Sequence, residues 1–230
     1  MPTSALLPEL DSRLAEVRDR IAAAAARAGR SAPVRVVAVT KTHGAETVDA
    51  AVAAGLTDVG ENKVQEALEK MAVVRSAPRW HLIGHLQRNK AKHAPAFAMV
   101  HSLDSERLAI ALDEAAAARG VVLDVLVQVN VSGEATKGGV EPSALAAFAD
   151  QLHGCLALRV AGVMTMAPYT DEATVLRQVF RAACACGEQL ERAGHPAVER
   201  SMGMSNDYEI AVEEGATMVR LGSVLFGSRH

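Results

Sequence analysis

The sequence is poor in the residue types that mark several large classes of protein. Aromatic residues make up 3% of the 230 residues, tryptophan occurs once, and the formal net charge is -3. Proteins that bind nucleic acid usually combine a basic surface with aromatic side chains that stack on bases, so no nucleic-acid partner is expected. No apolar run reaches membrane-spanning length, and the N-terminus lacks the basic-then-apolar order of a signal peptide. We therefore expect a cytoplasmic protein with no membrane partner.

Cysteine is also rare, since the chain contains only Cys155, Cys184 and Cys186. Cys184 and Cys186 lie two residues apart in an expected helix, where their side chains diverge, so neither a disulfide nor a shared metal site is predicted. Histidine is more frequent, but no His-x-His pair follows the first strand, as it would in a metal-dependent barrel hydrolase. No metal centre is expected.

Lysine is the scarcer basic residue, with six lysines against eighteen arginines. One of the six, Lys41, follows the apolar, β-branched run VRVVAVT, so it lies at the end of a predicted buried strand. Such a lysine is an ion-pair partner, for example of Glu61, a charge that solubilises the strand end, or a nucleophile. A desolvated lysine amine is neutral and attacks aldehydes, so Lys41 is the candidate for a Schiff base with an aldehyde cofactor.

Strand-like and helical patterns alternate along the chain. Strands are predicted at residues 34–40, 56–60, 80–84, 98–103, 122–131, 158–164, 197–204 and 217–223. Helices are predicted at residues 45–54, 62–74, 87–92, 105–119, 142–153, 171–192 and 206–214, after an amphipathic helix that ends near residue 30. No Asn-Gly or Asp-Gly hairpin turn joins two strands, and such alternation requires a parallel sheet.

Eight strand–helix units in about 200 residues are typical of a closed (β/α)8 TIM barrel. An open, doubly wound sheet is the alternative. It normally carries a glycine-rich dinucleotide-binding turn after its first strand, whereas this chain has KTHGAE there. No Pro-, Ser- or Gly-rich linker divides the sequence, so a single α/β barrel domain spanning residues 1–230 is predicted.

In a TIM barrel the polar residues at the carboxyl ends of the strands form the active face. Here those residues are Lys41, Thr42, Glu61, Asn62, His85, Asp104, Asn130, Met164, Thr165, Ser205, Asn206, Arg220, Gly222 and Ser223. Barrels often bind phosphate in the loops after strands seven and eight. Ser205 or Asn206 is expected to cap the next helix, with Glu209 completing a capping box, and Gly222-Ser223 adds backbone and a hydroxyl group. The last two strand ends therefore favour a phosphate site.

Arg220 lies beside this phosphate site in the last strand. It is either an ion-pair partner inside the barrel or a hydrogen-bond donor to the pyridine nitrogen of a pyridoxal cofactor. Because arginine stays protonated, it would keep that nitrogen unprotonated, and the cofactor would withdraw electrons less strongly than in an aminotransferase. The basic segment QRNKAKH at 87–93 is interpreted as a solvated helix face with weak anion contact.

Seven segments together resemble one known family. They are AVTKTHG, DVGENKVQEA, WHLIGHLQRNK, QVNVSGEATKGGV, GVMTMAPY, SMGMSNDYEIAVEEGATMVRLGS and LFG, in this order along nearly the whole chain. The sequence is similar to the pyridoxal phosphate homeostasis proteins of the YggS/PROSC type. This resemblance implies a TIM barrel of the alanine racemase N-terminal-domain type, with an extra N-terminal helix, and the cofactor pyridoxal 5'-phosphate (PLP).

The resemblance also implies roles for single residues. Lys41 matches the lysine that binds PLP covalently, and Arg220 matches the arginine at the pyridine nitrogen. The other cofactor-binding residues are Asn62, Met204, Ser205, Gly222 and Ser223, of which Ser205, Gly222 and Ser223 form the phosphate cradle. The chain departs from the family at His43-Gly44, where relatives often have lysine-proline. This difference concerns the loop after the first strand and leaves the Schiff base expected.

The implied function is PLP binding in cellular PLP homeostasis and supply, with little or no catalytic turnover. Racemases of this fold use a second, β-rich domain that supplies an opposing tyrosine, and this sequence ends at His230, soon after the eighth strand. The alternative is a small PLP-dependent amino-acid racemase or related fold-type III enzyme, with His85 or Tyr208 as the second acid. A monomer is expected, with apo PLP-dependent enzymes as partners. No role is predicted for Lys137.

Overall fold

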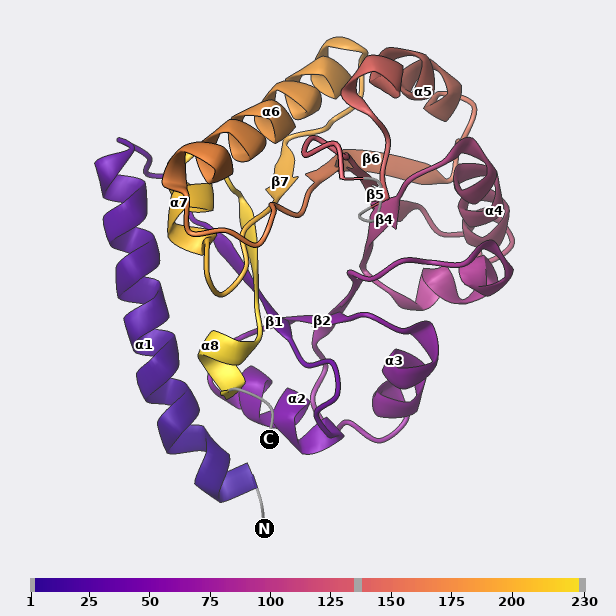
Figure 1. The fold of residues 1–230 in the computed structure, drawn as a ribbon. Coiled ribbons are helices and arrows are strands. Elements are labelled where there is room, and N and C mark those ends of the chain that lie inside the picture. Colours follow the sequence, from indigo (N-terminus) through magenta and orange to yellow (C-terminus); the bar gives the residue numbers. More distant parts are fainter. Residues whose placement is uncertain (1–2, 135–137, 228–230) are drawn as a thin grey trace.

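The chain forms a closed barrel of eight parallel strands, as the sequence predicts (Figure 1). The computed structural model describes residues 3–134 and 138–227, with side chains from Pro8 onward, so Lys137 lies outside the described residues. The strands are β1 Arg35–Val39, β2 Asp58–Glu61, β3 Arg79–Leu82, β4 Met99–Leu103, β5 Leu123–Gln128, β6 Leu158–Met164, β7 Glu199–Ser201 and β8 Met218–Leu221. Each strand pairs with the next along the chain, and β8 pairs with β1 to close the barrel.

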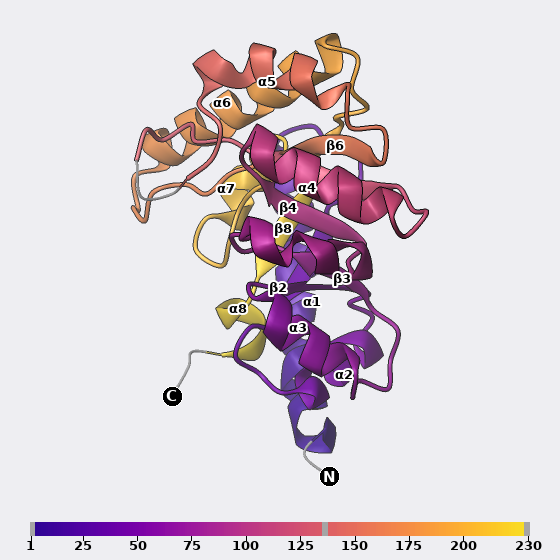
Figure 2. The same ribbon diagram turned by 90° about the vertical axis from the view of Figure 1, so that its right-hand side faces the viewer.

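Helices surround the strands on the outside of the barrel (Figure 1). They are α1 Thr3–Arg27, α2 Ala45–Ala53, α3 Val64–Met71, η1 Arg88–Ala96, α4 Glu106–Ala117, η3 Pro142–Ala144, α5 Leu145–Leu152, α6 Ala173–Arg192, α7 Tyr208–Glu213 and α8 Ser223–Phe226. Figure 2 shows α5 and α6 on one side of the barrel and α2 and α3 on the opposite side. Within the described part of the chain, no helix is both long enough and apolar enough to cross a membrane.

The predicted N-terminal amphipathic helix is present as α1. Its apolar side chains recur at helical spacing and are buried, namely Leu10, Leu14, Val17, Ile21 and Ala24. This face packs on α2, α7 and α8, so α1 lies along the outside of the barrel (Figure 1). Burial of a complete helix face removes several large apolar side chains from water, at about 1.5–3 kcal/mol for each one, which ties the extra helix to the barrel.

Several predicted elements differ in detail from the structure. The segment predicted as a helix at 87–92 is the 3-10 helix η1, which contains Pro95, a residue without a backbone N–H group. The predicted strand 197–204 is shorter, because the chain turns at Gly203 with φ +90° after β7. The predicted strand 217–223 ends at Leu221, and its last two residues begin the unpredicted helix α8.

The inside of the barrel holds two kinds of side chain. One kind is apolar and forms a cluster of Val37, Met99, Leu126, Ala161, Met164 and Met218. The other kind is polar, fully or almost fully buried, and consists of Asp58, His81, His101, Ser201 and Arg220. Strand register places the two kinds side by side, since Val37 pairs with Arg220, Met99 with His81 and Met218 with Ser201. The barrel interior is therefore packed, and its polar part leads to the pocket described next.

Candidate functional site

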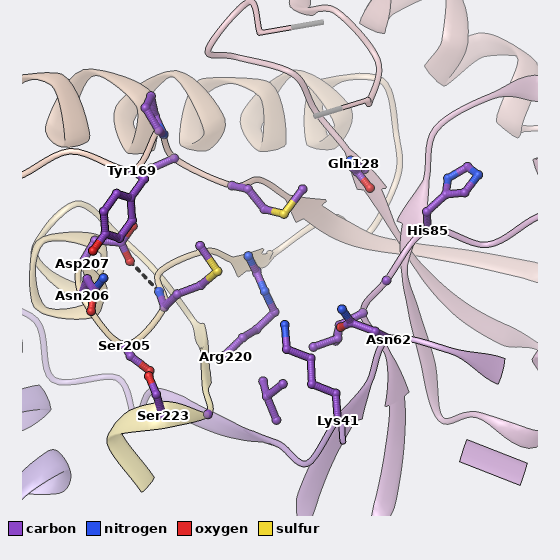
Figure 3. Close-up of a pocket in the computed structure, with 18 of the residues that line it drawn as sticks. Lys41, Asn62, His85, Gln128, Tyr169, Ser205, Asn206, Asp207, Arg220 and Ser223 are labelled. Atoms are coloured by element: carbon purple, nitrogen blue, oxygen red, sulfur yellow. Dashed lines mark hydrogen bonds between the residues drawn. The ribbon is translucent and has the colours of Figure 1, made fainter. Parts of the chain in front are cut away.

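A cavity of about 670 Å³ opens at the carboxyl ends of the barrel strands. This is the size of a pocket for a cofactor or other small molecule. Its walls contain all seven residues that were predicted to bind the cofactor, namely Lys41, Asn62, Met204, Ser205, Arg220, Gly222 and Ser223. Figure 3 shows the side chains of Lys41 and Arg220 extending into the same part of the cavity, with Ser205 and Ser223 next to each other on one wall.

Other predicted strand-end residues are divided between the pocket and its surroundings. His85, Asp104 and Asn206 line the cavity, and His85 Nδ1 lies 3.5 Å from Asp104 Oδ2. Asn130 does not line it, because its side-chain amide donates to the backbone oxygen of Glu134. Thr165 is buried behind the wall, where its hydroxyl donates to the backbone oxygen of Val129.

Gln128 lines the pocket in place of Asn130. Strand β5 ends at Gln128, three residues before the end of the strand predicted at 122–131. Side chains alternate along a strand, so Gln128 shares the inward face of Leu126. The alternation of side chains along this strand is the feature of the sequence that could have identified Gln128 as a pocket residue. The loop 166–171 after β6 also lines the cavity, and its Tyr169 is 94% exposed at the rim. No feature of this loop singled it out in the sequence, apart from its place in one of the family segments.

The backbone on both sides of Lys41 is held by α3. The ammonium of Lys70 donates to the backbone oxygen of Thr40 at 2.8 Å, and the carboxylate of Glu66 accepts from the backbone N–H of Thr42 at 2.6 Å. Thr42 has φ +67°, a left-handed conformation that is strained for a residue with a branched side chain. These contacts fix the strand end that presents Lys41 to the cavity (Figure 3).

Glu61, the ion-pair partner considered for Lys41 from the sequence, is bound by Lys70. Glu61 Oε1 accepts from Lys70 Nζ at 2.7 Å and from the Thr40 hydroxyl at 2.6 Å. Burial raises the pKa of Glu61, against the effect of Lys70 and Thr40. Burial also opposes ionisation of Glu66, but hydrogen bonds from Lys70 and Thr42 outweigh it and lower the pKa of Glu66. The cluster therefore anchors the strand end beneath Lys41.

Arg220 is buried at the end of β8 and is held by uncharged groups. Its Nη1 donates to the backbone oxygen of Ser201 at 2.7 Å and to the Ser201 hydroxyl at 2.8 Å, while Nη2 donates to the backbone oxygen of Thr165 at 2.8 Å. Burial lowers the pKa of Arg220 to about 10, against the charge of Asp207. The guanidinium thus remains protonated near neutral pH. None of these three bonds goes to a carboxylate.

The turn before α7 differs from the predicted capping box. The N-cap of α7 is Asp207, whose Oδ1 accepts from the backbone N–H of Met204 at 2.5 Å (Figure 3). Glu209 binds Arg20 of α1 instead of closing a box with Asn206. Ser205 and Asn206 consequently lie in the turn that lines the pocket, and the Ser205 hydroxyl accepts from the backbone N–H of Val224 at 3.3 Å. This bond joins the turn after β7 to helix α8.

Two glycines allow the strand ends to approach the pocket closely. A β-carbon at Gly84 would lie 2.3 Å from the backbone oxygen of Asn62, which only glycine permits. A β-carbon at Gly203 would lie 2.6 Å from that of Ala211, and φ at Gly203 is +90°. Gly84 therefore places Asn62 at the wall, and Gly203 places the turn that carries Met204 and Ser205.

Comparison of the sequence and the fold with those of known proteins finds several similar chains. The family model described as "Alanine racemase, N-terminal domain" matches residues 12–230. The pyridoxal phosphate homeostasis protein of Pseudomonas aeruginosa is 44% identical over 220 residues, covering 94% of each chain. The protein of the same name from Aquifex aeolicus is 40% identical over 221 residues, 94% of this chain and 97% of that one. The structure of PipY from Synechococcus elongatus with PLP bound has a TM-score of 0.83 at 36% identity, covering 95% of this chain and 100% of that one.

Proposed function

Because the chain belongs to the family of pyridoxal phosphate homeostasis proteins, with the fold of the alanine racemase N-terminal domain, we propose that it binds PLP covalently through Lys41 and takes part in PLP homeostasis in the cytoplasm. One observation carries this proposal above the others. A lysine amine and a buried arginine face the same cavity, whose wall includes Ser205 in the turn after β7 and Ser223 at the start of α8. PipY, a similar protein of known structure, has been solved with PLP bound.

The residues of the pocket fit the chemistry of PLP. When bound, PLP supplies an aldehyde that condenses with an amine and an aromatic ring that withdraws electrons. The pocket offers the amine of Lys41, the guanidinium of Arg220 for the pyridine nitrogen, and the hydroxyls of Ser205 and Ser223 for the phosphate. The amide of Asn62 and the thioether of Met204 complete the wall. Arg220 remains charged, so its N–H groups donate hydrogen bonds and do not yield a proton near neutral pH.

The phosphate part of the proposal predicts an effect of two serines. The double variant Ser205→Ala/Ser223→Ala is expected to bind PLP more weakly, by roughly 1.5–3 kcal/mol for each lost bond to a charged acceptor. Equilibrium titration with PLP measures this loss, and Ser143→Ala, an exposed serine in η3, is the matched control. The native protein should also bind pyridoxal, which has no phosphate, far more weakly. Equal affinities for the two aldehydes would show that the phosphate lies elsewhere.

We further propose that the protein has little or no catalytic turnover. Racemisation needs one group to remove a proton and another to return it from the opposite side. Tyr208, considered from the sequence as a second acid, does not line the cavity; it is buried, with the guanidinium of Arg20 5.5 Å from its ring centroid. The tyrosine that lines the cavity is Tyr169, at the exposed rim. The relatives named above are homeostasis proteins.

Turnover of both enantiomers of alanine, serine, glutamate and lysine tests this part of the proposal. We expect each rate to stay well below about 1 s⁻¹, the low end of ordinary enzyme rates. A faster rate with any of these substrates would favour the alternative, a small PLP-dependent racemase or related enzyme. His85, which lines the cavity beside Asp104, would then be the first residue to replace.

The proposed partners are PLP itself and apo PLP-dependent enzymes that receive it, and the proposed state is a monomer. The exposed position of Tyr169 supports an open pocket mouth, through which PLP is exchanged. Mixing the PLP-loaded protein with an apo-enzyme and following recovery of the enzyme's activity, with free PLP trapped, measures direct transfer. Recovery no faster than PLP release into solution would argue against a direct partner.

A further inference from the structure

A chain of four hydrogen bonds crosses the inside of the barrel and ends at Arg220. It joins Asp58 Oδ1 to His81 Nε2 at 2.8 Å, His81 Nδ1 to His101 Nε2 at 2.9 Å, His101 Nδ1 to Ser201 Oγ at 3.0 Å, and Ser201 Oγ to Arg220 Nη1 at 2.8 Å. Both imidazoles and Ser201 are completely buried. The five residues come from β2, β3, β4, β7 and β8, so the chain connects the amino end of β2 with the pocket.

The two ends of this chain of hydrogen bonds, Asp58 and Arg220, carry opposite charges. Arg220 is a donor only. Burial opposes ionisation of Asp58, but hydrogen bonds from His81 and Thr57 outweigh it and lower the pKa of Asp58, so its carboxylate is an acceptor. Two more cations lie near this carboxylate, since Arg79 Nη1 is 3.7 Å and Arg35 Nε 4.0 Å from Asp58 Oδ1. A negative end at the floor of the barrel thus faces a positive end at the pocket.

One proton on each imidazole between these ends allows only one order of protons. Burial lowers the pKa of His101 well below its usual range, so this ring is neutral and donates through one nitrogen only. The carboxylate of Asp58 requires a proton on Nε2 of His81. When this is the only proton on the ring, Nδ1 of His81 is an acceptor. His101 then donates through Nε2 and accepts at Nδ1 from the Ser201 hydroxyl. Every bond therefore points from Arg220 towards Asp58.

This order controls what Arg220 meets in the wall of the pocket. With its proton directed at His101, the Ser201 oxygen presents a lone pair to Nη1 of Arg220 and helps to fix the plane of the guanidinium. An amide in place of the Asp58 carboxylate is able to donate to His81 Nε2. The whole chain would then reverse, and His101 would donate to the same Ser201 oxygen that Arg220 uses. The contact at Arg220 would weaken without any change in the residues that touch the pocket.

We propose that Asp58 is a positioning residue which, through His81, His101 and Ser201, orients the guanidinium of Arg220 toward the pyridine nitrogen of bound PLP. This inference rests on the proposed function. The positioning acts through a buried network of hydrogen bonds that all point in one direction. Such networks couple their members more strongly than separate hydrogen bonds do. It gives a role to two buried histidines that do not line the cavity.

Nitrogen NMR of the ligand-free protein tests the proton order without PLP. We expect His81 and His101 to carry their protons on Nε2, and the Asp58→Asn variant to move both protons to Nδ1. His195 is the internal control, because it is not part of the hydrogen-bond chain. Its Nε2 bonds to the backbone oxygen of Ala149, so its tautomer should not change. A proton on Nδ1 of either His81 or His101 in the native protein would overturn the proposal, and this holds whether or not Asp58→Asn folds.

Release of PLP tests the coupling to Arg220. Once the native protein has been shown to bind PLP, which decides the proposed function separately, Asp58→Asn is expected to bind it too but to release it at least about threefold faster, with a shifted absorbance maximum. Arg79→Gln removes a charge near Asp58 but changes no member of the hydrogen-bond chain. It should leave the release rate and the absorbance maximum unchanged. In a Ser201→Ala background, Asp58→Asn should have no further effect. The proposal would be overturned if Asp58→Asn released PLP at the rate of the native protein. It would also be overturned if Asp58→Asn changed the release rate equally with and without the Ser201 hydroxyl.

Discussion

The Lys41→Ala variant is expected to hold no covalently bound PLP and to lack the near-visible absorbance of the loaded protein. Lys41 supplies the amine at the pocket, and alanine has no group that condenses with an aldehyde. The fold should be retained, because the flanking residues Thr40 and Thr42 are held by Lys70 and Glu66. Absorbance of the dialysed protein after loading with PLP measures the loss, and thermal unfolding checks the fold.

The matched control for this variant is Lys63→Ala. Lys63 is exposed at the N-cap of α3 and does not line the cavity, so its replacement should leave the absorbance unchanged. A Lys41→Ala protein that keeps the band after dialysis, or a Lys63→Ala protein that loses it, would mean that another amine holds the cofactor.

The Lys70→Met variant is expected to lose about 3–5 kcal/mol of the free energy of unfolding at neutral pH, the usual cost of removing one partner of a buried ion pair. Glu61 is completely buried, and Lys70 is the cation bound to it. Its removal leaves Glu61 and Glu66 without their ammonium, and the backbone oxygen of Thr40 with the N–H of His43 as its remaining donor. Urea unfolding measures the loss, and Lys92→Met, an exposed lysine in η1, is the control.

The loss in Lys70→Met should depend on pH. Burial already raises the pKa of Glu61, and without Lys70 that pKa rises further. A carboxyl with a raised folded-state pKa contributes most stability below its unfolded pKa, and this contribution falls as the pH rises through the folded pKa. The deficit relative to the native protein should therefore be larger at about pH 8 than at about pH 5. An equal deficit at both pH values would show that Glu61 does not depend on Lys70.

The barrel and most of the pocket could be predicted from local patterns. Runs of β-branched residues such as 34–40 indicate buried strands, and their alternation with helical segments requires parallel pairing. Because the carboxyl ends of such strands meet at one face, Lys41, Asn62, Arg220 and Ser223 could be assigned to one pocket from the sequence alone. The structure brings these residues together in one pocket, and the resemblance to the family is confirmed by the relatives.

Features that depend on contacts far apart in the sequence could not be predicted. The anchoring of Thr40 and Thr42 by Lys70 and Glu66 needs the packing of α3 against the end of β1, and nothing in the sequence marks Lys70 for it. The capping box at Glu209 was wrong because Arg20, far away in the chain, binds this carboxylate.

The hydrogen bonds of His81 and His101 show the same limit. Both residues looked like isolated histidines in the sequence, and only closure of the barrel joins them to Asp58 and Ser201. The residue at a strand end was predicted wrongly where an apolar run continues past the end of its strand. This is the case in β5, where Gln128 lines the pocket instead of the predicted Asn130.

Borohydride reduction of the PLP-loaded protein, followed by digestion and mass spectrometry of the peptides, identifies the residue that carries the cofactor. Reduction makes the bond between the amine and PLP permanent, so the modified peptide reports the site directly. We expect one reduced adduct for each chain, on Lys41, and none after loading with PLP in the Lys41→Ala variant. A protein that carries no adduct, or an adduct on Lys63, Lys90 or another lysine, would contradict covalent binding at this pocket.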